Sequence, residues 1–300
     1  MTATSATPET GPIRAALAAW YADNGRHTLP WRHTRNPYAV LVSEVMLQQT
    51  QVERVLPYYT AWLERWPDFA ALAAASPAAV ITAWSGLGYN RRARALQAAA
   101  CIVVERHGGQ LPADPAQLRT IPGIGPYTAA ALCSFAFDQP VPVVDTNIAR
   151  VLARACLGAP AAASVRPRAI HDAAAALLPP CGARDHNLAL MDLGATVCAA
   201  RNPGCSACPL AEHCAWRRLG CPPPTAAPRR PAPRFETTAR YARGRIIERL
   251  RGGPATKPEL AAMLPPAHRT RLGEYLAALE RDGLVEPLPG DGWALPGTPA

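Results

Sequence analysis

Lysine is almost absent from this chain. Lys257 is the only one among 31 lysine and arginine residues, and the 300-residue sequence carries a net charge of +9. Residues 1–256 therefore contain no side-chain primary amine, which excludes Schiff-base chemistry by lysine from most of the chain. The surplus of arginine is compatible with a polyanionic partner such as nucleic acid, and equally with a merely basic protein.

Long apolar segments are absent as well. No uninterrupted apolar run reaches the roughly 18 residues that a membrane-spanning helix needs, and residues 1–12 lack the apolar centre of a signal peptide. Nine cysteines in a chain without an export signal indicate a reducing compartment, and metal ligation rather than disulfides. We therefore expect a monomeric cytoplasmic protein that does not contact a membrane.

Helical periodicity dominates the first part of the chain, and strict alternation is rare. Proline and glycine separate the periodic segments. The expected helices cover residues 12–23, 38–49, 51–65, 69–74, 77–85, 90–107, 115–119, 126–136, 146–157, 167–178 and 185–198. The pattern predicts an all-α body that ends near residue 220.

The composition changes after this body. Residues 221–234 are rich in proline and arginine and predict a stiff, basic linker. Residues 235–300 contain three further apolar-periodic segments, followed by two apolar stretches that flank a turn at residues 290–292, as in a β-hairpin. This order predicts a small winged-helix-like α+β domain, with Thr256 and Glu259 forming a capping box at the start of its second helix.

Four cysteines form a closely spaced group of potential metal ligands. Cys198, Cys205, Cys208 and Cys214 have the spacing C-x6-C-x2-C-x5-C. A site with four thiolates suits zinc or an iron–sulfur cluster. The other five cysteines divide into three expected core residues, Cys101, Cys133 and Cys156, and two without an assigned role, Cys181 and Cys221.

A second segment combines glycine with the start of a helix. Residues 118–129 read LRTIPGIGPYTA, so Gly123 and Gly125 flank one apolar residue just before the helix. Glycine lets a backbone approach a partner closely, and amides at a helix N-terminus can hold a phosphate. The segment resembles a helix-hairpin-helix DNA-binding motif, although an ordinary connection between two helices has the same ingredients.

Asp145 stands between an apolar stretch and the next helix. Residues 141–150 read VPVVDTNIAR, and taken alone Asp145 is best interpreted as the N-cap of that helix. Its place soon after the hairpin glycines adds a second interpretation. A helix-hairpin-helix followed by such an aspartate resembles the helix-hairpin-helix DNA glycosylase superfamily, and the cysteine loop resembles its iron–sulfur branch. The resemblance covers about residues 12–216.

A third segment separates two branches of that superfamily. Residues 38–49 read YAVLVSEVMLQQ, a helix that is apolar almost all round, so we expect Glu44 to be buried. Burial raises the pKa of a carboxyl, as a general acid near neutral pH requires; a structural pairing with arginine is the alternative. Residues 29–32, 43–50 and 86–90 read LPWR, SEVMLQQT and GLGYN, and they resemble MutY-type adenine glycosylases.

The resemblance implies a set of catalytic roles. Glu44 would protonate the adenine and so improve the leaving group, while Asp145 would stabilise the cationic sugar. Asn147 would orient Asp145, and Tyr127 would lie near the sugar, where endonuclease III-like enzymes have their Schiff-base lysine. Because the body has no lysine, we expect a monofunctional enzyme that hydrolyses the glycosidic bond without cutting the backbone.

The resemblance also implies binding roles on double-stranded DNA with a mispaired or oxidised base. Arg32 would lie near the base, Gln49 and Tyr89 would enter the helix or fill the gap when the base leaves the stack, and the hairpin turn would hold a phosphate. The expected base- and DNA-binding residues are Leu29, Trp31, Arg32, Gln48, Gln49, Tyr89, Gly123 and Gly125. The four cysteines would hold a [4Fe-4S] cluster that orders a basic loop, and the protein would associate with the nucleoid.

The same resemblance divides the body into two lobes and leaves alternatives open. A six-helix lobe with the hairpin would cover residues 30–140, and an iron–sulfur lobe would combine residues 12–29 and 141–220. Thr146 stands where MutY-type proteins commonly have glycine, and Leu188 where they often have Glu or Gln. Adenine opposite guanine or 8-oxoguanine is the expected substrate. The alternatives are a glycosylase for T or U opposite G, and a non-catalytic iron–sulfur DNA-binding regulator.

Overall fold

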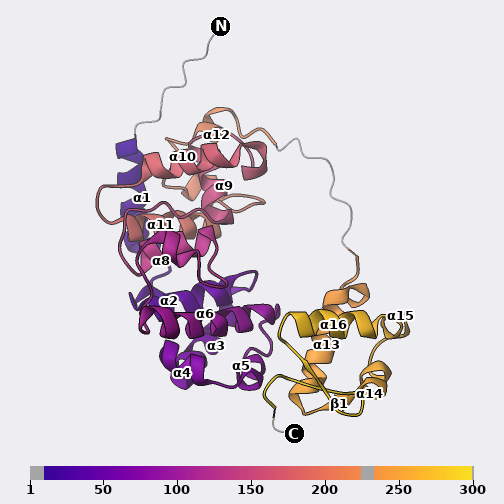
Figure 1. Cartoon of the computed structure of the whole chain (residues 1–300). Helices are drawn as coiled ribbons and strands as arrows, with labels where there is room; N and C mark the ends of the chain where they lie inside the picture. Colours follow the sequence, from indigo (N-terminus) through magenta and orange to yellow (C-terminus); the bar gives the residue numbers. More distant parts are fainter. Residues whose placement is uncertain (1–9, 224–232, 299–300) are drawn as a thin grey trace. The chain divides into compact units, whose positions relative to one another are not determined.

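The computed structural model describes residues 10–223 and 233–298 and is built mainly of α-helices (Figure 1). Most of the linker predicted at residues 221–234 lies outside the described residues. None of the described helices has both the length and the apolar character that crossing a membrane requires. The described chain forms two compact units.

The first unit contains the described residues of Met1–Val40, Ala113–Arg119 and Gly125–Ala227. Its helices are α1 (Thr10–Asn24), α7 (Pro115–Leu118), α8 (Pro126–Phe135), α9 (Thr146–Ala155), α10 (Pro167–Leu177), α11 (Ala183–Thr196) and α12 (Ala215–Arg218), with 3-10 turns η1 (Pro30–Arg32), η2 (Ala162–Ser164) and η3 (Cys205–Ala207). Helix α9 packs against α10, α11 and α12, and α11 also contacts α1 and α8. Helices α9 and α11 are therefore the centre of this unit.

The second unit contains Leu41–Pro112, Thr120–Ile124 and the described residues of Pro228–Ala300. Its first part holds most of α2 (Pro37–Leu47), then α3 (Val52–Arg65), α4 (Phe69–Ala74), α5 (Pro77–Ala83) and α6 (Arg91–His107). Helix α6 packs against α4 and α5. Its buried residues include Ala93, Leu96, Ala100 and Val103, which recur at helical spacing and turn one face of α6 to the core.

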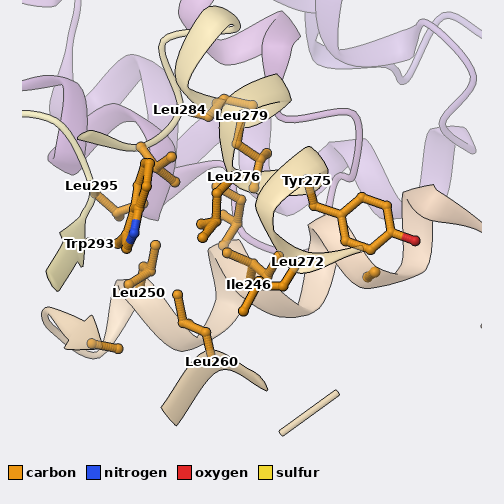
Figure 2. Packing of buried hydrophobic residues seen from close by; sticks show 14 of the residues in the cluster. Ile246, Leu250, Leu260, Leu272, Tyr275, Leu276, Leu279, Leu284, Trp293 and Leu295 are labelled. Atoms are coloured by element: carbon orange, nitrogen blue, oxygen red, sulfur yellow. The ribbon is translucent and has the colours of Figure 1, made fainter. Parts of the chain in front are cut away.

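Residues 233–298 form a C-terminal domain within the second unit. It contains the turn η4 (Phe235–Thr237), helices α13 (Ala239–Arg251), α14 (Lys257–Ala262), α15 (Pro266–Arg269) and α16 (Leu272–Arg281), and strands β1 (Ala255–Thr256), β2 (Glu286–Leu288) and β3 (Gly292–Ala294). The strands pair antiparallel in the order β1-β3-β2, with Trp293 opposite both Ala255 and Pro287. Figure 2 shows the apolar side chains of α16 turned toward α13, with Trp293 and Leu295 in the same cluster.

The predicted architecture is confirmed. Every helix expected in the body is present, with ends within a few residues of those predicted, and the helix order and hairpin of the C-terminal domain are those of the sequence prediction. Thr256 and Glu259 form the expected capping box. The prediction missed β1 and α15, because elements of two and four residues are too short for a periodic signal.

The lobes expected at residues 30–140, and at residues 12–29 together with 141–220, stay a prediction. Helices α7 and α8 of the hairpin belong to the unit that holds the cysteine loop, because α8 packs against α11. The C-terminal domain belongs to the unit that holds α3 to α6, because its core includes Ile81 of α5. Contacts between segments that are distant in the sequence decide which unit the hairpin helices and the C-terminal domain belong to. Local sequence patterns do not predict such contacts.

His186 on α11 is a buried titratable side chain. It is 8% exposed, and within the described residues its Nε2 has no hydrogen-bond partner. Burial, assisted by the charge of Arg14, lowers the pKa of His186 from 6.5 to about 4. The folded chain therefore holds this ring in its neutral form at neutral pH.

We expect His186 to make the folded chain less stable in mild acid. As the pH falls from 6.5 toward 4, the unfolded chain binds a proton that the folded chain does not, so stability is lost over this window. The loss at pH 5 relative to neutral pH is about 2 kcal/mol. Urea unfolding at both pH values should show this loss for the natural chain and not for His186→Phe, which cannot bind the proton. Equal losses in both proteins would contradict the assignment.

Candidate functional site

The helix-hairpin-helix segment consists of α7, a turn at residues 119–125 and α8. Gly125 is the N-cap of α8 and Pro126 is its first residue, so the helix begins where the sequence predicted. Proline suits this position because the first amide of a helix has no intrahelical partner. The Asp114 side chain caps α7 by accepting from the N–H of Gln117, whereas Gly125 provides no side-chain cap. The turn runs from the end of α7 at Leu118 to the start of α8 at Pro126.

The two hairpin glycines serve different purposes. Gly123 has φ +79°, and a Cβ built on it would lie 3.0 Å from the Cβ of Ala95 on α6. Gly125 has φ −86°, and a Cβ built on it would have nothing within 4 Å. The fold therefore requires glycine at 123, whereas the open backbone at Gly125 is available to a partner from outside.

Glu44 lies in a helix that is apolar on nearly all sides, as the sequence predicted. Its neighbours Leu41, Val42, Val45 and Met46 are 0–4% exposed, and Glu44 itself is 8% exposed. Glu44 belongs to the second unit, whereas Asp145, Asn147 and Tyr127 belong to the first.

Gln48 and Tyr89, two of the expected DNA contacts, are tied to one guanidinium. Nη1 of Arg92 donates to the carbonyls of Val45, Met46 and Gln48 at 2.6–2.9 Å. Its Nη2 donates to the Leu87 and Gly88 carbonyls and to Thr50, and the group lies 5.7 Å from the Tyr89 ring centroid. Burial lowers the pKa of Arg92 to about 10, so it stays charged at neutral pH.

The residues beside this guanidinium have unusual backbone conformations. Gln49 and Tyr89 both have positive φ, at 57° and 47°. Gln49 is exposed, and Tyr89 is 42% exposed, so Tyr89 is not a core aromatic. Non-glycine residues hold such conformations only where the surrounding bonds fix them. The Arg92 bonds supply that constraint, and no local motif in the sequence marked this arginine.

Asp145 is the N-cap of α9, as predicted. Its Oδ1 accepts from the N–H of Ile148 at 2.7 Å, and its Oδ2 accepts from Nδ2 of Asn147 at 2.9 Å. Nη2 of Arg150 donates in turn to Oδ1 of Asn147 at 2.9 Å. Burial raises the pKa of Asp145, while these two hydrogen bonds and the charge of Arg150 act to lower it.

Leu29, Trp31 and Arg32 lie together in and beside η1 and are 7–9% exposed. Nη2 of Arg32 donates to Oδ1 of Asp192 at 2.7 Å, and Arg26 pairs with the same carboxylate at 2.6 Å. Within the described residues, Nε and Nη1 of Arg32 have no hydrogen-bond partner. Asp192 therefore holds one nitrogen of the guanidinium and leaves the other two with free donors. No local pattern in the sequence indicated this buried aspartate.

The four spaced cysteines surround one cavity of the first unit. Cys198, Cys205, Cys208 and Cys214 all line it, together with apolar residues of α9 and α11. Nη1 of Arg154 donates to Sγ of Cys198 at 3.4 Å. Burial raises the pKa of Cys208 to about 11, so without a bound cation this thiol keeps its proton at neutral pH.

The donor set of this cavity suits a metal centre with thiolate ligands, because four cysteine side chains line it. A zinc ion takes four sulfurs about 2.3 Å from one point. A [4Fe-4S] cluster takes one thiolate on each iron. None of the nine cysteines, all within the described residues, forms a disulfide.

Comparison with known proteins agrees with this geometry. Residues 42–166 match the family model of the HhH-GPD superfamily base excision DNA repair protein. An adenine DNA glycosylase from Mycolicibacterium smegmatis is 46% identical over 94% of this chain and 95% of its own length. The mouse adenine DNA glycosylase is 44% identical over 73% of this chain and 44% of its own length. A solved structure of a thermostable thymine-DNA glycosylase has a TM-score of 0.65 at 29% identity, and covers 70% of this chain and 97% of its own.

The near full-length relative shows that the chain is a base excision DNA repair protein, in agreement with the HhH-GPD family model over residues 42–166. Within that class, the chain belongs to the adenine DNA glycosylase family, as the near full-length relative shows.

The two hairpin glycines should respond differently to alanine. Gly123→Ala combines a disfavoured positive φ with crowding against Ala95, and should cost about 1–3 kcal/mol in urea unfolding. Gly125→Ala is its matched control and should change stability by less than about 0.5 kcal/mol. If a phosphate approaches the open backbone, Gly125→Ala should still weaken binding to a duplex. Equal destabilisation by both changes would refute this division of roles.

Proposed function

We propose that this chain hydrolyses the N-glycosidic bond of adenine opposite guanine or 8-oxoguanine and leaves the DNA backbone intact. The near full-length adenine DNA glycosylase relative supports removal of adenine in base excision repair. The observation that carries the proposal is a pair of carboxyl groups in unlike surroundings: Glu44 on an apolar helix, and Asp145 at a hydrogen-bonded helix N-terminus. Separate environments let one carboxyl act as acid and the other as anion.

In this proposal Glu44 donates a proton to the adenine and so improves the leaving group. Asp145 stays ionised and stabilises the positive charge that develops on the sugar. The Asn147 amide holds Oδ2 of Asp145, so the carboxylate cannot rotate away from the sugar. Tyr127, in the first turn of α8, would lie near the sugar, and water would complete the hydrolysis.

The scarcity of lysine supports a monofunctional reaction. Cutting the backbone through a Schiff base needs a primary amine, and Lys257 is the only lysine of the chain. Lys257 lies in the C-terminal domain, at the first position of α14. Tyr127 stands in the hairpin helix that carries the lysine in the endonuclease III-like enzymes that the sequence resembles. The product would therefore be an intact strand with an abasic site, which alkali cleaves.

The four cysteines would hold a [4Fe-4S] cluster in the cavity that they line. Its chemistry there would be to cross-link the loop by four metal–thiolate bonds. Arg154 supports this role, because its guanidinium donates to the Ala199 and Ala200 carbonyls and lies 4.7 Å from the Trp216 ring centroid. These bonds hold the loop to α9 on the side away from solvent, since Arg154 is 6% exposed.

A thymine or uracil substrate opposite guanine is the second candidate. Leu188 on α11 is 5% exposed and carries no polar group for adenine, and the thymine-DNA glycosylase structure shares the fold. Single-turnover base release from duplexes with A opposite 8-oxoguanine, A opposite G, and T or U opposite G decides between them. Alkali-dependent cleavage at A supports the first candidate. Cleavage at T or U, or strand cleavage without alkali, would refute it.

Base release should require the ionised form of Asp145. Protonation of this carboxylate should therefore set the acid limb of the pH–rate profile. Its protonation removes the charge that stabilises the sugar, so the rate falls as pH decreases through its pKa. The Asn147 amide acts to lower that pKa, so Asn147→Ala should move the limb to higher pH. Thr146→Ala is the matched control, because the Thr146 side chain does not bond Asp145, and it should leave the limb in place. A limb at the same pH in Asn147→Ala would contradict the role of Asn147.

Iron content should separate the ligands from the neighbouring cysteine. Cys208→Ser removes one of four expected ligands and should lower bound iron well below about four atoms per chain. Cys221→Ser changes a cysteine of the same region that lies outside the spaced group, and should keep the iron of the natural chain. Iron analysis and visible absorption of the purified variants measure both. If iron is lost in Cys221→Ser but kept in Cys208→Ser, the proposed assignment of the four ligands is wrong.

A further inference from the structure

The C-terminal domain is bonded directly to α5 and to the start of α6. Ile81 of α5 belongs to the same hydrophobic cluster as the apolar residues of the C-terminal domain. Nη2 of Arg251 on α13 donates to the Ile81 carbonyl and to Oδ1 of Asn90, both at 3.2 Å. Nε of Arg94 on α6 donates to the Gly283 carbonyl at 3.0 Å. Shared core and buried arginine bonds make the domain a fixed part of its unit.

This attachment brings Arg240, in the first turn of α13, into contact with the Tyr89 side chain. Its Nη1 donates to the Tyr89 hydroxyl, and its guanidinium lies 5.2 Å from the centroid of that ring. The same guanidinium lies 4.9 Å from the centroid of Phe235. The three side chains form a continuous group, called here the Tyr89–Arg240–Phe235 stack.

The stack is exposed although two of its members are aromatic. Tyr89 is 42% and Phe235 is 47% exposed, and they are two of only four large hydrophobic side chains that are exposed in the described residues. Exposed aromatic groups that gather at one place indicate a binding surface rather than a core. Phe235 is held there from behind, since its ring packs edge-on against Tyr241 at 5.7 Å.

The charge of α13 points to a polyanion. The helix contains five arginines and one glutamate. Within the described residues Arg243, Arg249 and Arg251 form ion pairs, whereas Arg240 and Arg245 form none. A guanidinium beside aromatic rings suits DNA, because the cation binds phosphate while the rings stack on bases. Arg240 has further N–H groups for a phosphate oxygen beyond the one given to Tyr89.

We propose that the Tyr89–Arg240–Phe235 stack is a DNA-binding surface that the C-terminal domain adds to the unit that carries Glu44. Arg240 is a positioning residue for the Tyr89 ring and binds a phosphate of the same duplex. The partner is double-stranded DNA around the extruded base, because Arg92 ties Tyr89 to the backbone of Gln48. The proposal rests on the proposed function, since it assumes that Tyr89 contacts DNA.

Equilibrium binding tests this surface without requiring catalysis. The probe is a duplex with 2′-fluoro-2′-deoxyadenosine opposite 8-oxoguanine, titrated by fluorescence anisotropy at several salt concentrations. Arg240→Met should raise Kd about tenfold and reduce the salt dependence by about one phosphate contact. Arg240→Lys should restore the salt dependence but not the full affinity, because an ammonium group does not replace the planar guanidinium.

Arg271→Met is the matched control. Arg271 is an exposed arginine of the same domain, lies 5.3 Å from the Tyr275 ring centroid, and pairs with Glu274. Arg271→Met removes the same charge as Arg240→Met and a similar contact between a guanidinium and an aromatic ring. If DNA binding depends on the position of the arginine rather than on the total charge of the protein, this change should alter Kd by less than about twofold. Thermal unfolding of both variants checks that each is folded, which is expected because both side chains are exposed.

A double-mutant cycle with Tyr89→Ala tests the positioning role. Because Arg240 acts partly through Tyr89, Arg240→Met should weaken binding less in the Tyr89→Ala background than in the natural chain. Equal Kd and salt dependence for the natural chain and Arg240→Met would overturn the proposal, and so would an equal loss in Arg271→Met. Fully additive effects would overturn the positioning role.

Base release measured on the same proteins separates this inference from the proposed function. If adenine is released but Arg240→Met binds like the natural chain, the DNA-binding surface is wrong and the enzymatic proposal stands. If Arg240→Met weakens binding while no adenine is released by the natural chain, the enzymatic proposal is wrong and the surface stands.

Discussion

Two arginines of one helix hold the cysteine loop against the segment that carries Asp145. Arg150 donates to the Cys198 carbonyl at 2.7 Å and to Oδ1 of Asn147 at 2.9 Å, so one side chain contacts both the loop and the group that orients Asp145. Arg154, one turn further along α9, binds the loop backbone beyond Cys198. An irregular loop needs partners for its buried carbonyls. Here α9 supplies them, and its N-terminus is fixed as a result.

The preference for arginine over lysine has a structural reason at several of these places. Arg92 reaches six acceptors from two separate turns, more than the three N–H groups of a lysine could satisfy. Nη2 of Arg32 donates to Asp192, while its Nε and Nη1 remain available as donors within the described residues. A planar, multidentate cation can join several backbone carbonyls at once, while an ammonium acts as a single point of charge. The same composition leaves Lys257 as the only lysine of the chain.

The C-terminal domain differs from a tethered module in how it meets the rest of its unit. Its core extends into α5 through Ile81, and the Ala78 N–H donates to the carbonyl of Pro296 near the end of the described chain. The domain is thus attached to α5 both through its core and close to its C-terminal end. The Mycolicibacterium smegmatis relative aligns along nearly the whole chain, whereas the alignment with the mouse relative covers 73% of it. A surface that involves this domain would therefore belong to part of the family.

The sequence by itself determined the helices, their caps and the grouping of the cysteines. Asp145 as an N-cap, the burial of Glu44 and the Thr256 capping box follow from local periodicity and from side chains that bond their own backbone. Only the tertiary structure decided which arginine serves which carbonyl, and that Arg240 lies on Tyr89, 151 residues away in the chain. Such contacts depend on how distant helices pack, and no local pattern encodes them.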